Sequence, residues 1–260
     1  MTEPEDVALN RRLWDLVSAQ FAGAEGMARW AEPDLRWGLS GAPESELLVL
    51  GDVAGLTAVE LGCGSAHLSA WLVRQGARCT AVDLSEAQLA SARMAQREHG
   101  VEFALVQADA QRLPFADRSA DLVVSEHAAA AWCDPHDWVA EAVRILRRCG
   151  RLVFLTNSPL SAMCVPAEGG TAGTRLLRGP AELRKIHWPG GGVEHHPSHG
   201  DWIRILTDHG LVVEGLRELH GPGAHGEPAS RSAAAEYYGI ADADWASRWP
   251  VEDLWTARRV

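Results

Sequence analysis

The sequence contains no long hydrophobic run, and this absence excludes one large class of protein. None of its apolar stretches approaches the roughly 20 residues that a helix needs to span a bilayer, and no basic and apolar signal sequence opens the chain. The five cysteines form no C-x-x-C pair, which favours reduced thiols and argues against a cysteine zinc site. We therefore expect a cytoplasmic protein that does not bind a membrane.

Positive charge is also scarce. The chain has 24 Lys and Arg against 35 Asp and Glu, which gives a formal net charge of -11. Proteins that bind a phosphate backbone rely on clustered Lys and Arg. The one basic cluster, residues 144–151, lies at an expected helix end, where cations interact favourably with the helix dipole. Nucleic acid is therefore not an expected partner.

Tyrosine and phenylalanine are few, with two and four residues, whereas tryptophan occurs eleven times. Several tryptophans, among them Trp14, Trp37 and Trp132, lie in segments that connect the expected elements. Large flat side chains in such places can line a pocket for an apolar molecule or pack a cap onto the core. We expect residues 14–37 to face a small molecule.

A glycine loop is the most informative feature that the chain does contain. An apolar run at residues 56–61 leads into Gly62 and Gly64, and a helix-compatible pattern follows at residues 67–75. Glycine takes backbone angles barred to other residues and lets a ligand lie against the main chain. The sequence therefore predicts a strand, a tight turn and a helix around a bound ligand.

A carboxylate follows at the end of the next apolar run, residues 79–82. We expect Asp83 to lie at the tip of the neighbouring strand, where it can accept hydrogen bonds from both hydroxyls of a ribose. Dinucleotide-binding loops read G-x-G-x-x-G, but this chain has His67 where the third glycine belongs. The pattern disfavours a pyrophosphate, while Glu60, two residues before Gly62, suits a ligand with an ammonium group near a sulfonium.

Further segments follow in order. A strand that ends at Asp109 offers a carboxylate to the exocyclic amine of adenine, and the backbone NH of Ala110 can reach a ring nitrogen. Residues 121–125 predict a strand that ends at Ser125 and opens onto Glu126 and His127. Residues 143–154 predict a helix, a turn and a strand.

With these motifs the chain resembles the class I S-adenosylmethionine-dependent methyltransferases, whose first motif reads roughly E-x-G-x-G-x-G. It matches at Glu60, Gly62 and Gly64 and departs at Ala66, where the family commonly has glycine. The resemblance implies S-adenosyl-L-methionine as methyl donor and S-adenosyl-L-homocysteine as product. The residues it assigns to donor binding, with their neighbours in the motifs, are Glu60, Gly62, Cys63, Gly64, Asp83, Leu84, Asp109, Ala110, Ser125 and Glu126.

The resemblance also implies a single α/β domain with a Rossmann-like fold. We expect a sheet of seven mostly parallel strands with helices on both faces and an antiparallel last strand inserted beside the fifth. Around this sheet we expect an N-terminal helical cap (residues 1–50), a cofactor-binding core (55–156), a lid or substrate insertion rich in Pro and Gly (157–200), and a C-terminal helix and strand hairpin (201–260).

Methyl transfer from a sulfonium is a direct displacement, for which alignment of the reacting atoms can lower the barrier by about 7–11 kcal/mol. A base is needed only where the acceptor must lose a proton. His127, just after a strand end, and His199 are the candidate bases. The group His195, His196 and His199 suits a closing segment better than a metal site, so we expect no metal.

The sequence thus predicts methyl transfer to oxygen, nitrogen or carbon of a small molecule by a monomer or homodimer. Two alternatives stay open. One is an NAD(P)H-dependent reductase on a related sheet, and the other is a protein that binds S-adenosylmethionine without catalysis. Binding of nicotinamide cofactors, or tight donor binding with no turnover, would distinguish them.

Overall fold

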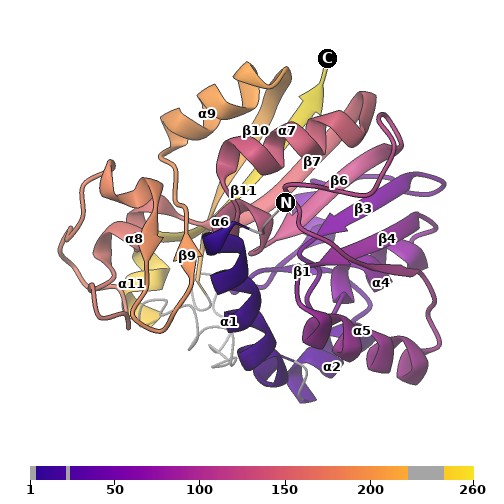
Figure 1. Ribbon diagram of the computed structural model, residues 1–260, viewed down its shortest axis with the longest axis horizontal. Helices are drawn as coiled ribbons and strands as arrows, with labels where there is room; N and C mark the ends of the chain where they lie inside the picture. The colour runs from indigo at the N-terminus through magenta and orange to yellow at the C-terminus, as the bar shows by residue number, and fades with distance from the viewer. Residues whose placement is uncertain (1–3, 22–23, 222–242) are drawn as a thin grey trace.

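A seven-stranded sheet forms the centre of the molecule (Figure 1), with the strand order β10-β11-β7-β6-β3-β4-β5. The computed structural model describes residues 4–21, 24–221 and 243–260. The strands of this sheet are β3 (Thr57–Leu61), β4 (Arg78–Asp83), β5 (Ala104–Gln107), β6 (Ala120–Glu126), β7 (Leu146–Asn157), β10 (Leu211–His220) and β11 (Pro250–Arg259).

The pairing of the strands confirms the expected topology. Strands β3 to β7 are parallel to their neighbours, whereas β11 is antiparallel to both β7 and β10. The last strand therefore lies beside β7, the fifth strand of the sheet. The inner parallel strands β3 and β6 are largely buried and read as apolar runs, as parallel strands between two layers of helices do.

Helices cover both faces of the sheet, as expected. The helices, with one short 3-10 turn, are α1 (Glu5–Phe21), α2 (Ala24–Ala31), α3 (Glu44–Leu47), α4 (His67–Arg74), α5 (Glu86–His99), α6 (Ala129–Trp132), α7 (Pro135–Ile145), α8 (Pro159–Cys164), η1 (Glu182–Arg184), α9 (His199–Asp208) and α11 (Ala243–Arg248). Helices α7 and α9 pack on one face through Trp138, Trp202 and Phe154. Helix α4 packs on the other face with Trp37 and Trp71. Several tryptophans thus fill the core.

Some predicted boundaries are wrong. The strand expected to end at Asp109 ends at Gln107. In residues 143–154, where we expected a helix, a turn and a strand, the helix ends at Ile145 and Leu146 already belongs to β7. The register of β6 and β7 shifts between the pairs Ala120–Leu146 and Leu122–Arg151, and Cys149 takes a left-handed φ of 63° within this irregularity. The chain therefore turns inside the strand and needs no separate loop.

Residues 157–200 contain more regular structure than their Pro and Gly content indicated. Besides α8 and η1, the segment forms a hairpin of β8 (Ile186–His187) and β9 (Val193–Glu194). Helix α1 runs across the front of the molecule between the sheet and this hairpin (Figure 1). Asn10 of α1 joins them, since its side chain donates to the carbonyls of Trp132 and Val193 at 2.8 and 2.9 Å and accepts from Val193 N at 2.7 Å.

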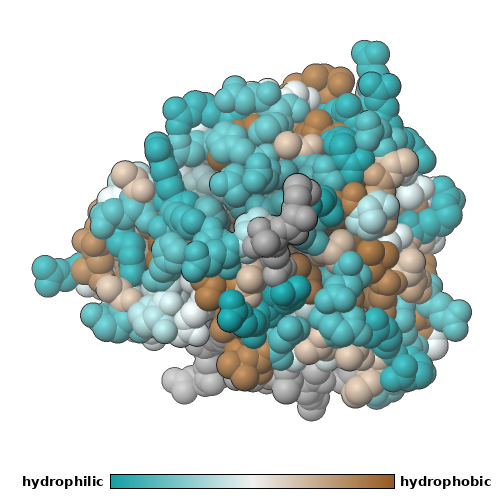
Figure 2. Space-filling model, viewed as in Figure 1, coloured by the Kyte–Doolittle hydropathy of each residue, from teal (hydrophilic) through white to brown (hydrophobic). Residues whose placement is uncertain are grey.

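The short hairpin of β1 (Arg36–Trp37) and β2 (Ala42–Pro43) packs beneath the other face of the sheet. In the view of Figure 2 the coloured side chains are mostly hydrophilic, with smaller hydrophobic areas between them. Among the described residues, no helix combines the length and the apolar character needed to cross a membrane.

Candidate functional site

The residues predicted to bind the donor lie at or just after the carboxyl ends of β3, β4, β5 and β6, which are neighbours in the sheet. The register aligns Leu61 with Val82 and Val82 with Val106, so these strands end at nearly the same level. The loops that follow them therefore gather at one edge, which is where open α/β sheets bind their ligands.

The two glycines of the first loop differ in what they accommodate. At Gly62, with φ 71°, a Cβ would lie 2.2 Å from Cβ of Ala128, so any side chain would clash. At Gly64, with φ 53°, the nearest atom to a Cβ is Gln88 Oε1 at 3.8 Å, so space opens beside the backbone. Ala66 also takes a left-handed φ of 63°, a conformation that favours glycine. Cys63 between the glycines is buried and donates its NH to Val82 O at 2.9 Å.

Asp83 holds this loop in place. Its Oδ2 accepts from Gly64 N and its Oδ1 from Ser85 N, both at 2.8 Å. Burial raises the pKa of this carboxyl to about 6. Nearby, Gln88 Oε1 is buried and accepts no hydrogen bond from the described residues. Such an atom fits a ligand that brings a donor into the space beside Gly64.

The segment expected to bind adenine, with Asp109 and Ala110, lies just after β5, the strand next to β4. Asp109 Oδ1 accepts from Gln111 N and Gln111 Nε2 at 2.9 and 3.1 Å, and Ala110 is buried. Burial, together with the charges of Asp109 and Asp83, raises the pKa of the Cys133 thiol well above its ordinary value.

Three other predicted donor residues also have structural partners. Glu60 is buried and accepts hydrogen bonds from the backbone and hydroxyl of Ser69 in α4, and burial raises its pKa to about 8. Ser125 donates to Leu61 O at 2.9 Å and accepts from Ala129 N at 3.1 Å. Leu84, half-buried, accepts from Gln107 at its carbonyl. Their roles toward a donor stay predictions.

Glu126 lies at the centre of an ion cluster that sequence analysis missed. Its carboxylate contacts Arg29 Nη2 at 2.9 Å and His67 Nε2 at 3.1 Å, and it accepts from Gly38 N at 2.8 Å. Burial alone would raise its pKa, but Arg29 and His67 outweigh burial and hold that pKa well below the ordinary value. The cluster ties the segment before β3 to the end of β6.

His127 lies directly after β6, as predicted, with a left-handed φ of 49°. Its Nε2 hydrogen-bonds to the carboxylate of Glu252, which is fully buried at the start of β11. The same carboxylate accepts from Leu39 N at 2.7 Å and Ser40 N at 2.9 Å. A buried carboxylate thus fixes the orientation of the imidazole, one strand away from the glycine loop.

The three histidines near residue 199 do not converge. His195 Nδ1 lies 2.7 Å from Arg184 O, and His196 Nε2 lies 2.7 Å from Glu194 Oε2. His199 Nε2 lies 2.7 Å from Asp253 Oδ2. His199 is thus tied to β11, which is three strands from β3, or about 14 Å across the sheet. The structure places His127 much nearer to the loop than His199.

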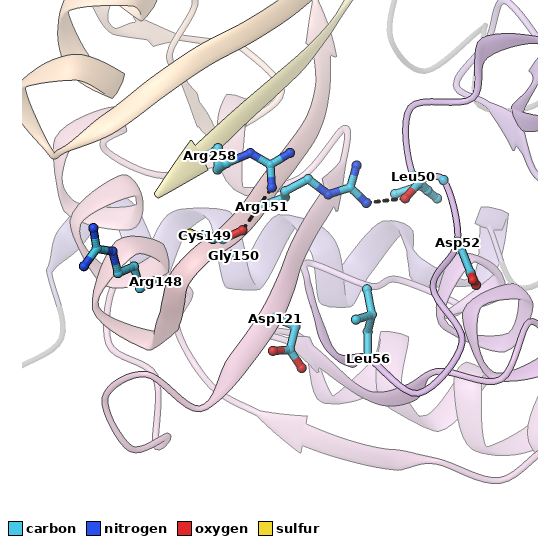
Figure 3. A pocket seen from close by; sticks show the side chains of 10 residues that line it. Leu50, Asp52, Leu56, Asp121, Arg148, Cys149, Gly150, Arg151 and Arg258 are labelled. Carbon is cyan, nitrogen blue, oxygen red and sulfur yellow. Dashed lines mark hydrogen bonds between the residues drawn. The ribbon is translucent and has the colours of Figure 1, made fainter. Parts of the chain in front are cut away.

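A hollow at the opposite end of the strands from the glycine loop contains arginine side chains (Figure 3). It is lined by the irregular turn of β7, by Asp121 and by Arg258, and the guanidinium groups of Arg151 and Arg258 lie side by side in it. These arginines donate to carbonyls, Arg258 to Cys149 O at 3.1 Å and Arg151 to Val49 O at 3.0 Å. The hollow is separate from the glycine loop.

Comparison with known proteins identifies the family. A model described as "Methyltransferase domain" matches residues 59–154. A malonyl-[acyl-carrier protein] O-methyltransferase of Hahella chejuensis is 32% identical over 180 residues, which cover 66% of this chain and 62% of the relative. A ubiquinone biosynthesis O-methyltransferase of Caulobacter sp. is 30% identical over 175 residues, covering 58% of this chain and 67% of the relative.

The first curated relatives are matched over only part of their length. For the enzyme of Methylococcus capsulatus, the match is 40% identical over 101 residues and covers 36% of that relative. Among solved structures, an S-adenosylmethionine dependent methyltransferase from Mesorhizobium loti superposes with a TM-score of 0.62 and 30% identity, covering 85% of this chain and 100% of the other. The chain therefore belongs to the class I S-adenosylmethionine-dependent methyltransferases.

Proposed function

We propose that the protein transfers a methyl group from S-adenosylmethionine to an oxygen of a small-molecule acceptor. One observation carries the proposal: the open space beside Gly64, where a Cβ would meet nothing closer than 3.8 Å, lies against Asp83 and against Gln88 Oε1, which has no partner among the described residues. The names of the relatives, which are O-methyltransferases, favour oxygen over nitrogen or carbon.

The donor site would be built from backbone and carboxylates. The main chain of residues 62–64 would lie along the donor, Asp83 would accept from its ribose hydroxyls, and Asp109 with Ala110 NH would hold adenine. The bound donor supplies an activated methyl group. The protein's contribution is then to align the acceptor with that group and to exclude water.

Helix α1 and the segment 157–200 would enclose the acceptor. Asn10 joins them, and Ser85 Oγ, at the end of β4, donates to Asp15 Oδ1 of α1 at 2.6 Å. An enclosed site favours a small acceptor over a protein or a nucleic acid, as does the net charge of -11.

His127 would accept the proton of a hydroxyl acceptor. Glu252 fixes its ring and would stabilise the imidazolium that forms. His127→Gln should then slow transfer to a hydroxyl by about 10²–10⁴-fold while donor affinity changes little. An unchanged rate would leave His127 with a structural role.

Calorimetry tests the donor. Wild-type protein is titrated with S-adenosylmethionine, S-adenosylhomocysteine, NADH and NADPH, beside the variant Asp83→Ala. We expect wild type to bind only the first two, and the variant to bind them more weakly by about 3 kcal/mol, since two hydrogen bonds to a charged group are lost. Binding of NADH or NADPH without binding of S-adenosylmethionine would contradict the proposal. Release of S-adenosylhomocysteine with a panel of phenols and carboxylic acids then tests catalysis.

A further inference from the structure

A row of oxygen-bearing side chains crosses three strands on the face of the sheet that α9 covers. The register places Glu218 of β10 directly opposite Asp253 of β11, and Asp253 directly opposite Thr156 of β7. Residues opposite one another in antiparallel strands share a face, with Cβ atoms about 4.5–5.5 Å apart. Two carboxylates facing each other at this distance repel and call for a cation between them.

His199 lies next to this row, on the side of the sheet that α9 covers. It is the first residue of α9, and its Nε2 lies 2.7 Å from Asp253 Oδ2. One ligand atom each of His199, Glu218 and Asp253 lies within 4.8 Å of the other two. Ligands about 2.1 Å from a tetrahedral ion are themselves about 3.4 Å apart, which falls between these two distances.

Two oxygens of the row lack partners. Asp253 is fully buried, yet its Oδ1 accepts no hydrogen bond from the described residues, and the hydroxyl of Thr156 is likewise buried and unpaired. A buried carboxylate of this kind is costly without a compensating charge. The site therefore favours an added positive charge.

We propose that His199, Glu218 and Asp253 bind one divalent transition-metal ion. One imidazole with two carboxylates suits Zn²⁺ or Mn²⁺ better than Mg²⁺, which prefers oxygen ligands alone. His199 is about one-third exposed and Glu218 is exposed, so an ion can enter from solvent. The proposal replaces the sequence-based expectation of no metal and gives His199 a role other than that of a base.

Calorimetry on the full chain tests the site without the methyl donor, so its outcome is independent of the proposed function. Protein treated with a chelator and dialysed is titrated with Zn²⁺, Mn²⁺ and Mg²⁺. We expect one equivalent of Zn²⁺ or Mn²⁺ to bind and to raise the melting temperature. Asp253→Asn and Glu218→Gln should each weaken binding at least about 100-fold.

Glu218→Gln keeps the test decisive if Asp253→Asn does not fold, because Glu218 is exposed. The matched control is Glu214→Gln on the same strand, whose carboxylate pairs with Arg258 and which should bind the ion like wild type. Equal affinity in wild type and Glu218→Gln, or no stoichiometric binding, would overturn the proposal. If no ion binds stoichiometrically, a raised His199 pKa measured by NMR would show that a proton on His199 supplies the positive charge that compensates Asp253.

Discussion

Buried carboxyl groups concentrate at the donor edge of the sheet. Glu60 and Asp83 flank the glycine loop, and burial raises the pKa of both, to about 8 and about 6. A raised carboxyl pKa means that the folded protein holds its proton where the unfolded chain has already lost it. Stability from these groups is therefore highest at low pH and falls as pH rises toward the folded pKa.

The effect should be measurable at Glu60. As pH rises from about 5 to about 8, this residue should lower the free energy of unfolding by roughly 3–5 kcal/mol. Glu60→Gln stays neutral and can still accept from Ser69, so its unfolding free energy should depend less on pH. Urea denaturation at several pH values measures the slope. The exposed Glu46→Gln is the control, and an unchanged slope in Glu60→Gln would contradict the account.

At the scale of elements, side chains far apart in sequence hold the parts around the site. Asn10 joins α1 to β9 through two hydrogen bonds with Val193 and to α6 through a third with Trp132. Glu252 accepts hydrogen bonds from the backbone NH groups of Leu39 and Ser40. The bonds of Asn10 help to hold α1 against the hairpin of the segment 157–200.

Asn10→Ala should loosen this contact. The backbone NH of the buried Val193 donates to Asn10 Oδ1, so loss of that acceptor should speed its exchange with solvent by about 10-fold or more, for a bond worth 1–3 kcal/mol. Hydrogen exchange followed by NMR or mass spectrometry measures the exchange rate of this amide. Arg12→Ala, on an exposed part of α1, should leave its exchange rate unchanged.

Local patterns predicted the elements well, because an apolar run before a glycine loop specifies a strand and a turn wherever the chain goes. The sequence could not show that His127 meets Glu252, 125 residues away, or that Asn10 meets Val193, 183 residues away. It also grouped His199 with its neighbours in sequence, whereas the fold pairs it with Asp253. Which side chains meet at a site depends on strand order, which periodicity does not encode.

At the scale of the whole molecule, β11 completes the structure. It fills the gap between β10 and β7, and it carries Glu252 on one face of the sheet and Asp253 on the other. Both residues are fully buried and each holds a histidine. One strand thus supports the sheet, the candidate base and the proposed metal site.

A chain that ends after Trp249 should therefore lose its cooperative thermal transition, because β7 and β10 would both be left with unpaired edges. Circular dichroism during heating makes the measurement. A chain that ends after Arg259 is the control, since it lacks only the exposed Val260 and should melt like wild type. A cooperative transition at nearly the same temperature in the shorter chain would contradict a central role for β11.

The position of β11 also bears on how the protein is made. A ribosome produces the strands in sequence, so β10 emerges without a neighbour and β7 presents an open edge until β11 leaves the exit tunnel. During that interval the nascent chain carries exposed β edges that could pair with other chains. The sheet can close only after translation has passed Arg259, so β11 should be the last strand to join it.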